Sequence, residues 1–84
     1  MDNSVYVEMC SPERGIYYKI YMKDLLGYEV KQGFFANTLI LRLTSGQTIK
    51  IKLDTESAIE AIRVIESARY NYQHGNKYVE AIDR

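Results

Sequence analysis

The sequence predicts a single α+β domain in which a twisted antiparallel sheet of about five strands packs against one long C-terminal amphipathic helix. Two observations predict this fold class. Apolar and polar residues alternate through most of residues 4–53, and this period of two is typical of half-buried strands. After Asp54 the apolar residues recur at spacings of three and four, as on a helix. Because 84 residues leave room for only one core, we expect residues 1–75 to form one domain.

The first two expected strands are Ser4–Met9 and Ile16–Met22, and the turn Cys10–Gly15 joins them. The proline and glycine of this turn interrupt strand pairing and favour a reversal of the chain. Each strand has one apolar face, which we expect to point to the core. These faces comprise Val5, Val7 and Met9 in the first strand and Ile16, Tyr18, Ile20 and Met22 in the second.

A third strand, Gly27–Gln32, follows the crossing Lys23–Leu26 and precedes the clearest hairpin of the sequence. The hairpin strands Thr38–Thr44 and Gln47–Leu53 alternate regularly. Ser45-Gly46 supplies a two-residue turn between them, in which glycine tolerates a positive φ. The residues expected to face the core are Tyr28, Val30, Leu39, Leu41, Leu43, Ile49, Ile51 and Leu53; Ile40, Arg42, Thr48, Lys50 and Lys52 are expected to face away.

The expected helix begins with Asp54 or Thr55 as its N-cap and ends before Gly75, a residue favoured just past a helix end. One stripe is apolar and is expected to cover the sheet, while the opposite face is polar and is expected to contact water. The stripe comprises Ala58, Ala61, Ile62, Ile65, Ala68 and Tyr72. Residues 76–84 form a C-terminal extension of uncertain structure, because Tyr78, Val79 and Ile82 suit either a short helix or an added strand.

Two adjacent phenylalanines, Phe34 and Phe35, precede the hairpin. Only one of two adjacent side chains on an extended segment can point inward. The other either covers the end of the sheet, as the usual burial of phenylalanine favours, or belongs to a contact patch.

The stretch of residues 16–68 resembles a pleckstrin-homology-like domain. The similarity is clearest in TLILRLTSGQTIKIKLDTESAIEAI (residues 38–62), which reads as strand, glycine turn, strand and helix. The resemblance implies a barrel that is partly open, because the family usually has seven strands and this sequence offers about five. It also implies a protein-binding role. The lipid-binding members carry a basic first loop, whereas Cys10–Gly15 contains only Arg14 as a basic residue.

Composition favours a cytoplasmic protein without a membrane span. Eleven basic residues balance eleven acidic ones, although residues 15–53 are basic and the flanking segments are acidic. Cys10 is the only cysteine, so an intrachain disulfide is impossible, and small secreted domains usually depend on disulfides. The sequence has neither a signal-peptide pattern nor an apolar run of about 20 residues.

The sequence contains no motif of an enzyme, a metal site or a cofactor site. His74 is expected to lie exposed at the helix end, and Cys10 has no histidine near it in sequence to activate its thiol. We therefore expect a protein that is not an enzyme and that binds neither a metal nor a cofactor.

One surface stands out as a candidate binding site. If the strands pair as expected, cationic and tyrosine side chains share the sheet face that points away from the helix: Tyr17, Lys19, Tyr21, Arg42, Lys50 and Lys52. Such a face is compatible with a simple solvated surface or a barrel interior, with a protein interface, or with nucleic acid held by stacking and phosphate contacts.

The function predicted best is that of a non-enzymatic protein–protein interaction module. A homodimer that pairs through an open strand edge, or through residues 78–82, is one form of this prediction. The small size and the lack of catalytic residues also suit an inhibitor or accessory protein of a phage or mobile element. The alternative is a nucleic-acid-binding protein that uses the basic, tyrosine-bearing face.

Overall fold

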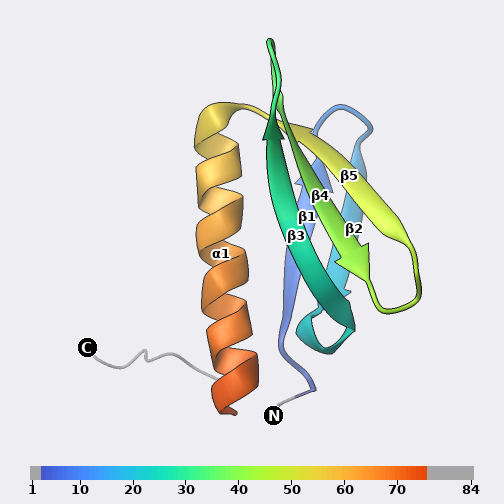
Figure 1. The fold of residues 1–84 in the computed structure, drawn as a ribbon, viewed down its shortest axis with the longest axis vertical. Coiled ribbons are helices and arrows are strands. Elements are labelled where there is room, and N and C mark those ends of the chain that lie inside the picture. Colours follow the sequence, from blue (N-terminus) through green and yellow to red (C-terminus); the bar gives the residue numbers. More distant parts are fainter. Residues whose placement is uncertain (1–2, 76–84) are drawn as a thin grey trace.

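The computed structural model describes residues 3–75, which form five strands, a short 3-10 helix and one long α-helix (Figure 1). The α+β class with a C-terminal helix is therefore confirmed. Residues 76–84, for which the sequence left helix and strand open, lie outside the described residues. In chain order the elements are β1 (Tyr6–Ser11), β2 (Ile16–Tyr21), η1 (Met22–Asp24), β3 (Leu25–Gln32), β4 (Asn37–Leu43), β5 (Thr48–Leu53) and α1 (Thr55–His74).

The strands form two antiparallel sheets instead of the single sheet that we expected. One sheet is the β1–β2 hairpin, and the other has the order β3–β4–β5. β1 and β5 lie close to each other, but an apolar cavity of about 180 Å³ opens where they meet α1. Helix side chains, including Val64, line this cavity. Because no strand pairing crosses this seam in the described part of the chain, the sheets do not close into a barrel.

Both sheets and the helix nevertheless share one core. Val7 and Ile20 from the first sheet and Leu41 and Ile51 from the second are buried, together with Ile65 of α1, which is 0% exposed. The inward faces predicted from the two-residue alternation are thus largely confirmed. Two residues differ. Ile16, predicted to face the core, is 41% exposed, because it stands at the start of β2 beside the turn, whereas Ile40, predicted to face outward, is only 7% exposed. Its cross-strand neighbours are Glu29 and Lys50, whose long side chains flank it on the outer face.

The hairpin turns differ slightly from their predicted form. β1 extends through Cys10 to Ser11, so the first turn is one of four residues, 12–15, and Gly15 has a φ of +68°. In the β4–β5 hairpin the Leu43 N–H donates to the Gln47 carbonyl at 2.9 Å, which makes the loop three residues long instead of two. Gly46 ends this loop with a φ of +93°, as its position in the sequence predicted.

The crossing between the sheets is η1, which ties the first sheet to the second through backbone hydrogen bonds. The Met22 N–H donates to the Val5 carbonyl at 2.9 Å, and the Asp24 carbonyl accepts the Thr44 N–H at 2.8 Å. Met22 is itself buried in the core and η1 packs against α1. This short segment therefore links the two sheets where the chain passes from β2 to β3.

Helix α1 begins and ends as the sequence predicts. The Asp54 carboxylate accepts the Ser57 N–H at 2.7 Å, and this bond holds the pKa of the carboxyl group below its ordinary value. At the other end Gly75 adopts a left-handed conformation with a φ of +71°. Of the predicted stripe, Ala58, Ile65 and Ala68 are buried, whereas the other members are partly exposed.

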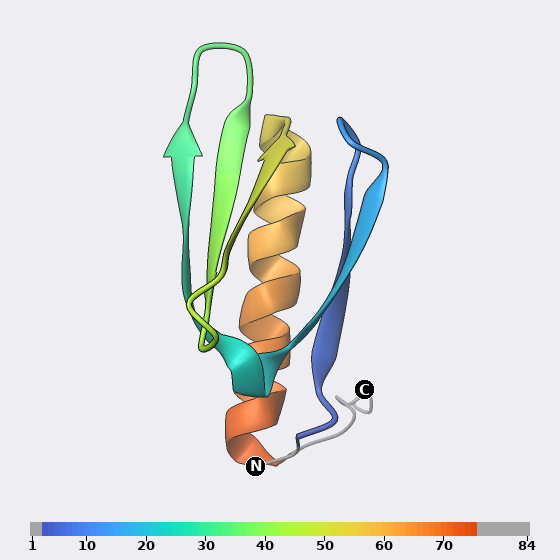
Figure 2. The same cartoon turned by 90° about the vertical axis from the view of Figure 1, so that its right-hand side faces the viewer.

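The arrangement gives the molecule two distinct ends. The β3–β4 loop and the β1–β2 turn lie at one end, and α1 runs from this end to the other (Figure 1, Figure 2). Figure 2 shows the helix behind both sheets, so that their outer faces are open on the side away from it. Within residues 3–75 the structure has no helix long and apolar enough to cross a membrane.

Candidate binding surfaces

The most exposed aromatic residues lie together at the tip of the β3–β4 hairpin. The last paired residues are Gln32 and Asn37, and the loop between them holds Phe34 and Phe35. Their side chains are 94% and 93% exposed, and their rings pack edge to face with centroids 4.9 Å apart. The expectation that one of the two side chains points inward is wrong, because both lie in the loop beyond the last strand pair. Neither ring covers the sheet, so the structure favours the contact-patch alternative. We call Phe34 and Phe35 the aromatic tip.

Gly33 allows the chain to turn tightly into the aromatic tip. A Cβ atom at this position would lie 2.4 Å from the carbonyl oxygen of Ala36, closer than two such atoms can approach. Any larger residue at position 33 would therefore force the backbone of the loop to move. The Asn37 side chain also donates to the Thr55 hydroxyl at 3.3 Å, which anchors the base of the loop to the start of α1.

A second surface lies on the outer face of β3–β4–β5, below the aromatic tip. The strand register places Lys31 and Lys52 on either side of Thr38, in one row across the three strands. The next row is formed by Glu29, Ile40 and Lys50. A hollow of about 390 Å³ opens over these two rows, and we call it the basic hollow. Its lining residues are Glu13, Arg14, Lys31, Thr38, Ile40, Lys50 and Lys52.

Arg42, a predicted site residue, does not line the hollow. Its guanidinium donates to the Glu29 carboxylate at 2.9 Å, and both side chains are about half exposed. A surface ion pair of this kind contributes little to stability. Its effect here is local, because Arg42 neutralises Glu29, the acidic residue of the second row.

The tyrosines of the predicted site belong to the other sheet. Lys19 lies in β2 with its ammonium 4.3 Å from the ring centroid of Tyr6 and 5.5 Å from that of Tyr21. The two rings lie 5.4 Å apart. A hydrogen bond with Tyr21 raises the pKa of Lys19 above its ordinary value. Tyr17 is 75% exposed at the other end of the strand.

The six predicted site residues therefore do not lie on one continuous sheet. Tyr17, Lys19 and Tyr21 belong to β1–β2, and Arg42, Lys50 and Lys52 belong to β3–β4–β5. The structure brings Lys50 and Lys52 together with Lys31 and Arg14. Neither Lys31 nor Arg14 belongs to the six predicted residues, although both line the hollow. Arg14 lies near these lysines because of the angle between the two sheets, and a local sequence pattern does not predict that angle.

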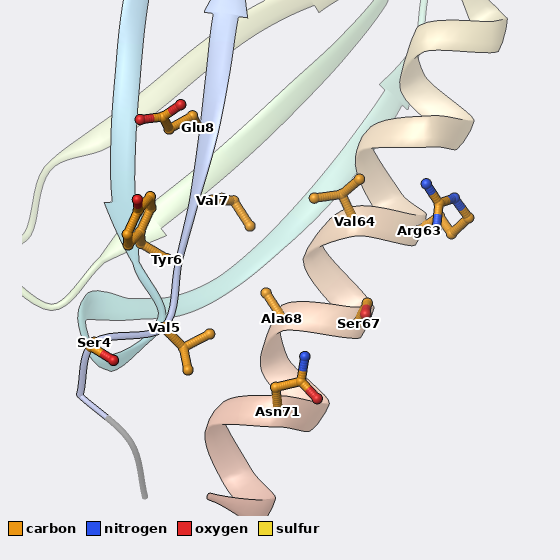
Figure 3. Close-up of a pocket in the computed structure, with 10 residues that line it drawn as sticks. All are labelled: Ser4, Val5, Tyr6, Val7, Glu8, Arg63, Val64, Ser67, Ala68 and Asn71. Atoms are coloured by element: carbon orange, nitrogen blue, oxygen red, sulfur yellow. The ribbon is translucent and has the colours of Figure 1, made fainter. Parts of the chain in front are cut away.

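A groove of about 520 Å³ lies between β1 and α1. Figure 3 shows Val5 and Val7 on the strand side, facing Val64, Ala68 and Asn71 on the helix. Arg63 lies at the groove rim and is bound to Glu60, one turn earlier on the helix, so that the pKa of Glu60 is lowered. Both apolar and polar side chains line the groove, and the polar ones include Glu8, Ser67 and Asn71.

The two residues considered for chemistry occupy ordinary positions. His74 stacks on Tyr70 near the end of α1, with ring centroids 4.0 Å apart. Cys10 is exposed in β1, opposite Tyr17 in the strand register, and borders the cavity between β1, β5 and α1. Among residues 3–75, no three histidine, cysteine or acidic side chains lie close enough together to hold a metal ion.

Comparison of the chain with protein-family models, with curated proteins and with solved structures found no match to any of the three.

Proposed function

We propose that this domain is a non-enzymatic protein-interaction module that binds its partner through the aromatic tip. The observation that carries the proposal is the exposure of Phe34 and Phe35, 94% and 93%, on adjacent residues of one loop. Phenylalanine is among the residue types most often buried in folded proteins. Burial of one such side chain is worth roughly 1.5–3 kcal/mol, so a pair left in water is a large unused source of binding energy.

The position of the pair supports a role in binding. The β3–β4 hairpin extends beyond the rest of the second sheet, and the loop stands at its far end (Figure 1). The mutual ring contact of the pair and the tight turn at Gly33 limit its freedom before binding, which reduces the conformational entropy lost when it enters a pocket. Aromatic anchors of this kind commonly dominate the energy of protein interfaces.

The rest of the molecule fits the role of a scaffold for this loop. A pleckstrin-homology-like ancestry, with a partly open barrel, remains our proposal for the arrangement of two hairpin-built sheets and a terminal helix. Of the roles known in that family, protein binding is the one that we propose for this domain. We further propose that the partner belongs to a larger assembly that this small protein inhibits or assists, as accessory proteins of phages and mobile elements do.

Site-specific photo-crosslinking tests the proposal. The photoreactive residue p-benzoylphenylalanine replaces Phe35 in the full chain, and adducts formed in cells of the native host are identified by mass spectrometry. The matched control carries the same residue at Thr44, an exposed position in the loop at the opposite end of the sheet. We expect one protein adduct that is enriched at position 35 and absent at position 44.

The same experiment separates the remaining candidates. An adduct with a second copy of the chain identifies the predicted homodimer as the interaction. An adduct that disappears after nuclease treatment supports the nucleic-acid alternative instead. Equal labelling at positions 35 and 44 would show that the tip has no partner and would overturn the proposal.

A further inference from the structure

We propose that the basic hollow binds an acidic peptide segment, and that this segment belongs to the partner held by the aromatic tip. This inference rests on the proposed function, because it assigns a second contact to the same partner. The hollow and the tip are continuous: Lys31 and Thr38 are paired residues of β3 and β4, one pair below the last pair before the loop. A partner that covers the tip is therefore brought over the hollow.

The charge of the hollow supports an anionic ligand. Four of its lining residues are basic and one, Glu13, is acidic. Within residues 3–75, none of the four cations forms an ion pair, whereas Arg42 and Glu29 beside them are paired with each other. Like charges held close together repel one another, and a bound anion removes that repulsion. The chain as a whole has no net charge, so the attraction is local to this surface.

The spacing of the cations fits an extended peptide. Lys50 and Lys52 are alternate residues of β5 and project from the same face about 6.5–7 Å apart. Alternate side chains of an extended peptide have the same separation, so two acidic residues of a bound segment can each meet one lysine. Lys31 lies two strands away from Lys52, at about 10 Å, and closes the hollow on its other side.

The shape of the hollow favours a peptide over other polyanions. A concavity of about 390 Å³ holds a few side chains, with the buried Ile40 at its floor, whereas the flat surface of an anionic membrane cannot enter it. Nucleic acid is usually bound along a longer track of cations with exposed aromatic platforms. Here Lys19 lies against the rings of Tyr6 and Tyr21, and these three residues lie outside the hollow.

Fluorescence anisotropy with a labelled octaglutamate peptide tests the inference directly. We expect saturable binding that weakens as salt increases, because the interaction is between exposed charges. An octaglutamine peptide of the same length should not bind. The variant Lys50→Gln/Lys52→Gln should lower the affinity by about tenfold or more, which corresponds to a loss of about 1.4 kcal/mol.

A matched control removes the same charge elsewhere. The variant Lys19→Gln/Lys23→Gln also loses two positive charges, but these residues belong to β2 and η1 and lie outside the hollow. We expect its affinity to change by less than about twofold. Amide chemical shifts in the NMR spectrum should move at Arg14, Lys31, Thr38, Lys50 and Lys52. An equal loss of affinity in both variants would mean that only net charge matters and would overturn the assignment.

Two further arms separate the inference from its alternatives. Tighter binding of a single-stranded oligothymidine, or of phosphatidylserine vesicles, than of octaglutamate would replace the acidic peptide by that class of ligand.

The variant Phe34→Ser/Phe35→Ser should bind octaglutamate normally, because it leaves the hollow intact. If octaglutamate fails to bind while crosslinks at position 35 persist, the hollow is not a site but the interaction module stands. If the peptide binds and the crosslinks are absent, the aromatic tip does not bind a partner, and the proposed function fails while the hollow remains a site.

Discussion

At the scale of single residues, environment decides the behaviour of side chains that look alike in the sequence. Tyr28 and Tyr17 are both tyrosines on strands, yet Tyr17 is largely in water while Tyr28 packs against the core. The Tyr28 hydroxyl donates to the carboxylate of Glu66, and the Arg69 guanidinium lies 5.9 Å from the centre of its ring. Burial, followed by this hydrogen bond, raises the pKa of Tyr28 from its ordinary value of 10.0 to about 12.

This shift predicts a loss of stability in alkaline solution. Below pH 10 the phenol is protonated in both the folded and the unfolded state and has no effect on the pH dependence. Between pH 10 and about 12 the unfolded chain releases this proton first, so the free energy of unfolding falls as pH rises. Tyr28→Phe should remove this part of the fall, and Tyr17→Phe is the matched control. Urea unfolding at several pH values measures it; identical profiles for the wild type and Tyr28→Phe would contradict the shift.

At the scale of elements, the periodic pattern predicted most of the secondary structure and missed the details that depend on neighbours. The helix from Thr55 to His74 and its caps follow directly from the stripe that begins after Asp54. The pattern could not show that Ile40 is covered on the outer face, because this depends on the adjacent strands. It also could not show that Ile62 remains partly exposed, since a helix stripe is wider than the surface that a small sheet covers.

Two isoleucines in α1 allow the packing of the helix to be tested with a matched pair. Ile65 is 0% exposed and Ile59 is 62% exposed, in the same helix. Ile65→Ala should lower the free energy of unfolding by about 2–5 kcal/mol, because it leaves a cavity between α1 and both sheets. Ile59→Ala should change it by less than about 0.5 kcal/mol. If Ile65→Ala does not fold, the smaller change Ile65→Val should still cost about 0.5–1.5 kcal/mol. Similar effects at positions 59 and 65 would show that the helix packs on another face.

At the scale of the whole molecule, the division into two sheets is the feature that sequence reasoning could not reach. Local alternation identifies strands and their inward faces, but it carries no information about which edges meet. The alternation would allow β1 to pair with β5. In the structure these two strands are not paired, and a cavity lies between them and α1. The predicted site is divided for the same reason. Alternation places both Lys19 and Lys50 on outward faces, but it does not show that they belong to different sheets.

The seam predicts unequal protection against hydrogen exchange. β4 is paired on both sides, whereas β1 and β2 are paired only with each other. We expect the core amides of β4, such as those of Leu39 and Leu41, to exchange at least about tenfold more slowly than those of β2. Exchange followed by NMR at neutral pH gives both rates. Equal protection in the two sheets would mean that they open as one unit despite the missing pairing.

The direction of α1 has a practical consequence for the use of this domain. Because the helix runs away from the aromatic tip, the segment before β1 and the last turn of α1 both lie at the end of the molecule opposite to it (Figure 1). A fluorescent reporter, an affinity tag or a second domain joined at either side would thus leave the loop that carries Phe34 and Phe35 unobstructed. The fold can therefore serve as a scaffold. Replacing Phe34 and Phe35 by another pair of side chains would change the binding specificity of the loop without a change to the core.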